Sequence, residues 1–189
     1  LEKIGVKRFK KFILCIYHPP QEKIESITDH FKSMFLFLNK IDIPRIWISP
    51  NNDAGSSLVK SQFSRFRSNK DYIFDNLARK DYLTLLKHAH FLIGNSSSAV
   101  LEAPTFKTPC INIGFRQNGR FRSKNIIDVE KPKLNYLIKA YKKICSKSFK
   151  NSLQHLKNPY GDGKSAAKII NTLIKTKIDD KLLFKRITY

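Results

Sequence analysis

Four short apolar segments constrain the fold of this chain most strongly, because none of them alternates with polar residues. They are FILCIY at 12–17, IWI at 46–48, FLI at 91–93 and CINI at 110–113. Each is followed by a stretch rich in polar residues, Gly or Pro. A strand that is apolar on both sides is typical of a parallel sheet covered on both faces. Further strands are expected at 71–76 and 126–129.

Segments with helical spacing separate these strands. Between residues 22 and 39, apolar side chains recur at steps of three and four, the spacing of one helix face. Further helices are expected up to about residue 66 and at about 81–90, 99–106, 133–147 and 164–176. This alternation predicts an α/β fold, with a parallel sheet, helices on both faces, and strands ending at about residues 17, 48, 93 and 113.

The length of 189 residues is that of one ordinary domain. No apolar run approaches the roughly 20 residues of a membrane helix, so we expect no membrane partner, and the N-terminal segment lacks the apolar stretch of a secretory signal. The chain begins with Leu, and its only Met is Met34. We therefore expect the sequence to be part of a longer protein that carries the rest of the site.

The formal net charge of +21 raises the question of a polyanionic partner such as nucleic acid. Lys outnumbers Arg by 27 to 9, however, and the lysines are scattered. Arg is the side chain that forks onto phosphates and base edges. The composition favours a lysine-rich solvated surface, and a basic nucleic-acid-binding module remains the non-enzymatic alternative.

The three cysteines, Cys15, Cys110 and Cys145, show no paired spacing. An odd count without pairs argues against a disulfide framework and predicts a reduced, cytoplasmic protein. The histidines and cysteines also lack the spacing of a zinc site. No residue cluster in the sequence implies a metal or redox cofactor.

Ligands of open parallel sheets bind at the carboxyl ends of the strands. This rule selects four loops, at 18–21, 49–55, 94–98 and 114–120. The third loop has the sequence GNSSS, and its backbone amides and hydroxyls are suited to a phosphate or diphosphate at a helix N-terminus. The simpler alternative is helix capping by Ser97 or Ser98.

Three other side chains in or near these loops can carry chemistry. Glu102 lies four residues after Ser98, one position beyond the spacing of a capping box. Its carboxylate can accept hydrogen bonds from the paired hydroxyls of a ribose, or lie on the surface near a helix dipole. His18 can act as an acid, a base or a hydrogen-bond donor, or cap the strand end. Arg116 can neutralise phosphate charge, or lie on a surface loop.

In this order and spacing, these features resemble the C-terminal half of UDP-N-acetylglucosamine 2-epimerases of the hydrolysing type. The resemblance is carried by FLIGNSSSAVLEAPTFKTPCINIGFRQNGRFRSKNIIDV at 91–129, YHPP at 17–20, SPNNDAGS at 49–56 and NPYGDGKSAAKII at 158–170. It implies a Rossmann-like domain, the second of two in a GT-B-type enzyme. Residues 1–189 are then the UDP-binding domain, and the final helix is expected near the missing N-terminal domain.

The family releases UDP from UDP-N-acetylglucosamine and, with water, yields N-acetylmannosamine, an early step toward sialic acids. Related members act on other UDP-sugars, toward legionaminic-type acids. The resemblance implies that His18 is the active-site histidine, that Asn51 lies near the nucleotide and that Arg116 belongs to the UDP pocket. The catalytic carboxylates belong to the first domain, so the chain alone is expected to bind UDP without turning over the sugar nucleotide.

The same resemblance assigns the GNSSS loop and the helix after it. It implies that Ser96 and Ser97 bind the diphosphate and that Glu102 binds the ribose. The family usually has Arg directly before this glutamate, where this chain has Leu101. The local ion pair that such an arginine provides is therefore not expected from position 101.

Two other enzyme classes fit the motifs less well. Non-hydrolysing epimerases typically carry a GHR-type segment and a DSGG-type loop, where this chain has YHPP and GNSS. Many GT-B glycosyltransferases carry a second acidic residue about eight positions after the first, where this chain has Cys110. The oligomeric state stays open, a homo-oligomer included.

Overall fold

A computed structural model describes residues 9–20 and 24–184. The chain divides into two compact units, with the boundary in the sequence between Pro159 and Tyr160. The first unit is built on a six-stranded sheet in the order β3-β2-β1-β4-β5-β6, in which every pair is parallel. The strands are β1 (Ile13–Ile16), β2 (Arg45–Ile48), β3 (Asp71–Phe74), β4 (Phe91–Gly94), β5 (Cys110–Ile113) and β6 (Ile126–Val129). The strand order reverses between β1 and β4, which makes their carboxyl ends the topological switch point.

The six strands lie where the sequence predicts them, and the fold prediction is confirmed. Within β1, Ile13 and Cys15 belong to the apolar cluster on one face of the sheet, whereas Leu14 and Ile16 belong to the cluster on the other face. Burial on both faces is why this strand is apolar at successive positions.

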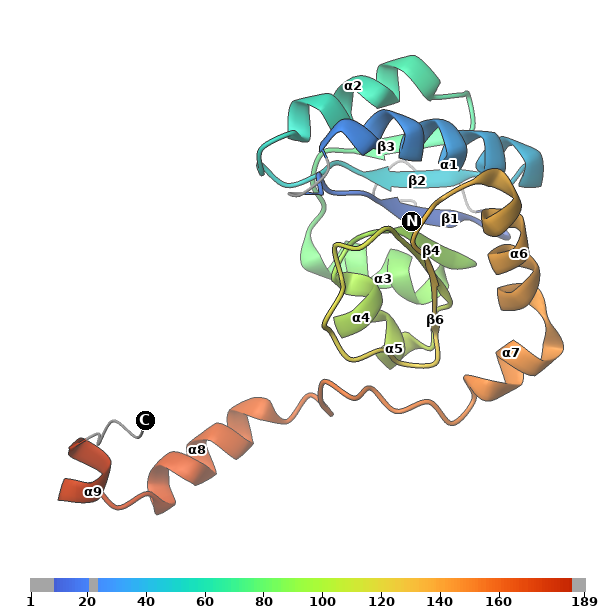
Figure 1. Cartoon of the computed structure of the whole chain (residues 1–189). Coiled ribbons are helices and arrows are strands. Elements are labelled where there is room, and N and C mark those ends of the chain that lie inside the picture. Colours follow the sequence, from blue (N-terminus) through green and yellow to red (C-terminus); the bar gives the residue numbers. More distant parts are fainter. Residues whose placement is uncertain (1–8, 21–23, 185–189) are drawn as a thin grey trace. The chain divides into compact units, whose positions relative to one another are not determined.

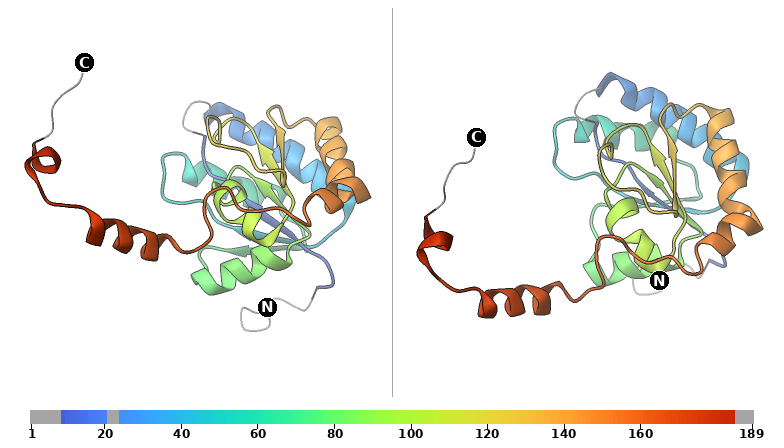
Figure 2. Two further views of the ribbon diagram at one scale, coloured as in Figure 1. Left: turned by 90° about the horizontal axis from the view of Figure 1, so that it is seen from below. Right: turned by 60° about the horizontal axis from the view of Figure 1, so that its bottom comes forward.

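Helices cover both faces of this sheet (Figures 1 and 2). The helices of the first unit are α1 (Ile27–Ile41), α2 (Ser56–Phe66), α3 (Arg79–His88), α4 (Ser98–Leu101), α5 (Ala103–Phe106), α6 (Leu134–Cys145) and α7 (Lys147–Ser152), with a 3-10 turn at Ile24–Ser26. Side chains of α1, α2, α6 and α7 pack in one apolar cluster, and side chains of α3, α4 and α5 pack in the other. The result is the three-layered arrangement of helices, sheet and helices.

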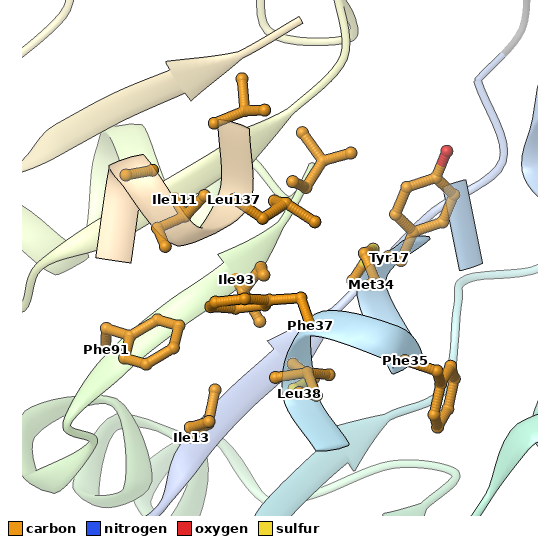
Figure 3. Close-up of a cluster of buried hydrophobic side chains, with 14 of the residues drawn as sticks. Ile13, Tyr17, Met34, Phe35, Phe37, Leu38, Phe91, Ile93, Ile111 and Leu137 are labelled. Carbon is orange, nitrogen blue, oxygen red and sulfur yellow. The ribbon is translucent and has the colours of Figure 1, made fainter. Parts of the chain in front are cut away.

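Aromatic and branched side chains fill the larger cluster. Figure 3 shows Phe37 and Leu38 of α1 and Leu137 of α6 gathered over residues of β1, β4 and β5. Deeper under α2, the rings of Phe35 and Trp47 stack with centroids 5.1 Å apart. Such packing fixes the positions of the strands whose ends carry the polar loops.

Several helix boundaries differ from the predicted ones: the helix expected at 81–90 spans Arg79–His88, and the one expected at 99–106 is divided into α4 and α5. The helix expected from residue 22 begins at Ile27, and residues 21–23 lie outside the described part of the chain. The helix expected at 133–147 ends at Cys145, because Ser146 adopts an extended backbone and its Oγ accepts a hydrogen bond from the Phe149 amide. That bond caps a separate helix, α7, which the sequence reasoning missed.

The second unit contains α8 (Ser165–Lys175) and α9 (Asp180–Leu183). The helix predicted at 164–176 is thus confirmed, whereas α9 was not expected. Both the assignment of 1–189 to one nucleotide-binding domain and the position of the final helix near a missing domain stay predictions. In the described ranges, no helix has the length and apolar character needed to cross a membrane.

Candidate functional site

The site begins at the switch point, where one buried asparagine ties two loops together. Asn95 follows β4 and is 1% exposed. Its Oδ1 accepts a hydrogen bond from the His18 amide at 2.7 Å, and its Nδ2 donates to the His18 carbonyl at 2.8 Å. A single side chain therefore satisfies both backbone groups of His18, 77 residues away in the sequence.

The glycine before Asn95 allows these two strands to meet this closely. Gly94 has a φ of 139°, and a Cβ atom there would lie 1.8 Å from the carbonyl oxygen of Ile16. That oxygen accepts a hydrogen bond from the Asn95 amide at 3.1 Å. A side chain at position 94 would therefore push apart the ends of β1 and β4.

Five residues from the four predicted loops form a closed circuit of polar contacts through side chains and backbone groups, which we call the polar ring (His18, Asn51, Asp53, Arg116 and Asn95). His18 Nδ1 lies 3.1 Å from Asn51 Oδ1, and Asn51 Nδ2 donates to Asp53 Oδ2 at 2.6 Å. Arg116 Nη2 lies 3.7 Å from the same Asp53 oxygen, and Arg116 Nη1 donates to the Asn95 carbonyl at 3.4 Å. The contacts between Asn95 and His18 close the ring.

The surroundings of His18 favour the neutral form of its imidazole. Burial lowers the pKa of His18, the Arg116 guanidinium lowers it further, and contacts with Asn51 and Asp53 oppose these two effects. The Asn51 backbone amide approaches Nδ1 at 3.3 Å. Nδ1 can instead donate to Asn51 Oδ1 at 3.1 Å, and the two bonds belong to different tautomers. In the tautomer whose Nδ1 accepts from the amide, the proton of the neutral ring is on Nε2, which is then a donor.

The serines of the GNSSS segment do not cap the following helix in the expected way. Ser97 precedes α4 but makes no side-chain capping bond, and Ser98 Oγ donates instead to Glu102 Oε2 at 2.7 Å. Ser96 Oγ accepts a hydrogen bond from the Ser98 amide at 3.3 Å. Since α4 has four residues, attraction of an anion here depends on local amides and hydroxyls more than on a helix dipole.

Glu102 belongs to a second polar group, which we call the carboxylate cluster (Glu102, Ser98, Arg79 and Tyr82). Arg79 Nη1 lies 2.8 Å from Glu102 Oε1, and the Tyr82 hydroxyl is hydrogen bonded to Ser98 Oγ. The side chain of Glu102 is 24% exposed. The cation beside this carboxylate thus comes from α3, whereas Leu101 is a half-exposed apolar side chain.

Two cavities lie beside these two groups. The larger, of about 830 Å³, touches the polar ring through Asn95 and Arg116 and extends to Tyr17, His30 and Glu130. The smaller, of about 250 Å³, touches the carboxylate cluster and is lined by Ile48, Asn76, Leu77, Arg79 and Tyr82. The GNSSS segment carries Asn95 of the polar ring and Ser98 of the carboxylate cluster, so it joins the two polar groups at the carboxyl end of β4.

The structure thus places four of the six predicted residues in the two polar groups and the other two on the segment between them. His18, Asn51 and Arg116 belong to the polar ring, and Glu102 belongs to the carboxylate cluster. Ser96 and Ser97 lie on the segment between the groups. Sequence reasoning missed Asn95, Asp53, Arg79 and Tyr82. Asn95 stands inside the GNSSS motif and Asp53 inside the selected loop at 49–55, whereas Arg79 and Tyr82 are recognisable only through the fold.

An open parallel sheet in this strand order, with polar loops linked where the order reverses, defines a Rossmann-like α/β domain whose crevice suits a nucleotide-type ligand. Residues 1–174 match the family model described as UDP-N-acetylglucosamine 2-epimerase. The chain belongs to the UDP-N-acetylglucosamine 2-epimerase family. In the described residues, no three His, Cys, Asp or Glu side chains gather as metal ligands.

Two curated relatives are 40% and 30% identical to this chain over the aligned residues. The GDP/UDP-N,N'-diacetylbacillosamine 2-epimerase (hydrolyzing) of Campylobacter jejuni is 40% identical over 98% of this chain and 49% of the relative. The UDP-N,N'-diacetylbacillosamine 2-epimerase (hydrolyzing) of Legionella pneumophila is 30% identical over 97% of this chain and 48% of the relative. The chain therefore spans about half the length of the curated relatives it matches.

Solved structures show the same fold. The UDP-GlcNAc 2-epimerase of Neisseria meningitidis bound to UDP-GlcNAc superimposes with a TM-score of 0.72 at 15% identity, over 92% of this chain and 47% of that one. The enzyme of Methanocaldococcus jannaschii in complex with UDP-GlcNAc and UDP gives a TM-score of 0.65 at 21% identity, over 88% of this chain and 45% of that one. The fold is that of one Rossmann-like half of a GT-B-type enzyme.

Proposed function

We propose that this chain is the UDP-binding half of a hydrolysing 2-epimerase that acts on a UDP-activated 2-acetamido sugar. The observation that carries the proposal is that the GNSSS segment joins the polar ring, through Asn95, to the carboxylate cluster, through Ser98. Family membership and the two relatives named as hydrolyzing enzymes support the reaction class.

The two polar groups fit the two ends of a nucleoside diphosphate. A carboxylate accepts hydrogen bonds from the adjacent hydroxyls of a ribose, so we assign the ribose to Glu102. The diphosphate then lies over Ser96 and Ser97, toward His18 and Arg116, whose donors match phosphate oxygens. This orientation directs the base toward the smaller cavity and the sugar toward the larger one.

In this assignment, the chain assists the departure of UDP. As the bond between the sugar C1 and the diphosphate oxygen breaks, negative charge develops on the β-phosphate. The Arg116 guanidinium and the Nε2–H of a neutral His18 stabilise that charge, and such electrostatic stabilisation is often the largest single contribution to catalysis. Removal of the sugar proton and addition of water at C1 are assigned to the half of the enzyme that this chain does not span.

The sugar is proposed as a class. Conversion of UDP-N-acetylglucosamine to N-acetylmannosamine is the reaction that the sequence resemblance implies, whereas the relatives at 40% and 30% identity are named for a sugar with two N-acetyl groups. Both sugars carry an acetamido group at C2, the centre whose configuration is inverted. No redox cofactor or metal enters the proposal.

The assignment of the ribose and the diphosphate is tested by titrating two ligands into folded variants. Glu102→Ala should weaken UDP by about 10- to 150-fold, the equivalent of one hydrogen bond to a charged group, and leave inorganic diphosphate unchanged. Replacing both Ser96 and Ser97 with Ala should weaken both ligands.

Asp42→Ala is the control, because Asp42 is also a carboxylate in an ion pair, with Lys70, and it precedes β2 at the amino edge of the sheet. The control should bind UDP and diphosphate like the parent chain. If Glu102→Ala also binds UDP like the parent, the ribose assignment is wrong, and if it loses diphosphate equally, Glu102 acts on the fold of the loop instead.

A further inference from the structure

Each oxygen of the Glu102 carboxylate accepts one hydrogen bond from the described residues. Oε1 accepts from Arg79 at 2.8 Å, and Oε2 accepts from Ser98 at 2.7 Å. A carboxylate offers about four lone-pair directions, two on each oxygen. One direction on each oxygen thus remains, which is the number that two adjacent hydroxyl groups require.

A chain of hydroxyl groups fixes the side of the carboxylate that Ser98 occupies. Ser98 has a single hydroxyl hydrogen, and it is donated to Glu102. The hydrogen bond between Tyr82 and Ser98 must therefore be donated by Tyr82. Burial raises the pKa of the Tyr82 hydroxyl, so it stays protonated and remains a donor. The direction of every bond leads from Tyr82 through Ser98 to Glu102.

Arg79 occupies a position that the helix itself disfavours. It is the first residue of α3, where the positive end of the helix dipole repels a cation. Its side chain is 73% exposed, so its ion pair contributes little to the stability of the fold. Since neither helix formation nor folding explains an arginine here, the orientation of Glu102 is the role that its contacts indicate.

We propose that Arg79 and Tyr82 are positioning residues, which hold the Glu102 carboxylate with its two open lone-pair directions toward the 2′- and 3′-hydroxyls of the ribose. This inference depends on the proposed function, in which Glu102 binds the ribose. Position 101 holds an uncharged leucine, so the cation beside the Glu102 carboxylate is Arg79, which comes from α3.

The test compares UDP, 2′-deoxy-UDP and inorganic diphosphate as calorimetric ligands of the 189-residue chain. The parent should prefer UDP to 2′-deoxy-UDP. Arg79→Ala should weaken the binding of UDP roughly two- to fivefold, the range of an exposed ion pair, and leave the binding of diphosphate unchanged. The preference for UDP over 2′-deoxy-UDP should decrease by the same factor. Arg79→Lys should retain more of the preference than Arg79→Ala, and Tyr82→Phe should narrow it roughly two- to tenfold.

Lys80→Ala is the matched control. Lys80 is the next residue of the same helix and is exposed, and its replacement with Ala removes the same positive charge. It should leave all three affinities unchanged. Equal weakening of UDP and diphosphate in Arg79→Ala would show that Arg79 contacts phosphate, and an unchanged preference for UDP would show that it orients nothing; either result overturns the inference while the proposed function stands. A parent chain that binds no UDP overturns both.

Discussion

Replacing Asn95 with Asp tests whether one amide holds the two central loops together. Asn95 is buried and makes two hydrogen bonds to the backbone of His18. An ionised carboxylate keeps the bond from the His18 amide, but its other oxygen then faces the His18 carbonyl, 2.8 Å from the position of the amide nitrogen. The variant loses one hydrogen bond and brings a carboxylate oxygen against the His18 carbonyl oxygen, so that two acceptors face each other. It also buries a negative charge where the parent has a neutral amide.

The expected cost follows from these changes. A lost neutral hydrogen bond is worth about 0.5–1.5 kcal/mol, and an unsatisfied buried polar group costs about 1–3 kcal/mol. We therefore expect Asn95→Asp to lower the free energy of unfolding by about 2–4 kcal/mol at pH 7.5. A protonated carboxyl can donate to the His18 carbonyl as the amide does, so the difference from the parent should shrink as the pH falls toward 5.

Urea denaturation of parent and variant at pH 7.5 and at pH 5 measures this difference. The titration of histidines that lie away from position 95 cancels, because only the difference in the free energy of unfolding is used. Asn95→Ala is the control, since it removes both bonds and carries no titrating group. If Asn95→Asp is as stable as the parent at pH 7.5, or if its loss of unfolding free energy does not shrink at pH 5, the role of Asn95 in joining the two loops is refuted.

Three other predictions concern the same region and the opposite edge of the sheet. Gly94→Ala should lose more than about 3 kcal/mol of unfolding free energy in urea, because its Cβ meets the Ile16 carbonyl and its φ is strained; stability equal to the parent would contradict this geometry. Burial, with two nearby lysines, lowers the pKa of His90 to about 4, below the roughly 6.5 of a histidine in an unfolded chain. The free energy of unfolding should therefore fall as the pH is lowered from 6.5 to 4. In urea titrations, His90→Gln should reduce that fall. A bound diphosphate should raise the lowered pKa of His18, so calorimetry at pH 6.5 in two buffers should show more proton uptake with the parent than with His18→Gln.

The strands could be predicted from the sequence because burial on both faces leaves a direct signature. The run at 12–17 is apolar at every position, and the strand found there is buried throughout. The helix boundary at Cys145 could not be predicted, because the apolar spacing continues past it and the end depends on the backbone angle at Ser146. Ser is a favoured N-cap residue, but the chain has many serines, and the sequence alone does not show which of them begins a helix.

The candidate site was predictable as a set of loops but not as a network. The rule for parallel sheets selects the loops that carry His18 and Arg116, and these loops do meet. The contacts that join them come from Asn95 and Asp53, whose partners are distant in the sequence. Arg79 was not predictable either, because its ion pair with Glu102 depends on the packing of α3 beside α5.

The measurement that tests the central claim most directly is a calorimetric titration of the 189-residue chain with UDP, at about 50 mM and about 200 mM salt, together with an assay for UDP release from UDP-N-acetylglucosamine. We expect one UDP per chain at both salt concentrations, and no release of UDP. A basic surface that binds polyanions would instead lose affinity steeply as salt rises. Absence of UDP binding, binding without a defined stoichiometry, or turnover by the chain alone would contradict the account of a UDP-binding half.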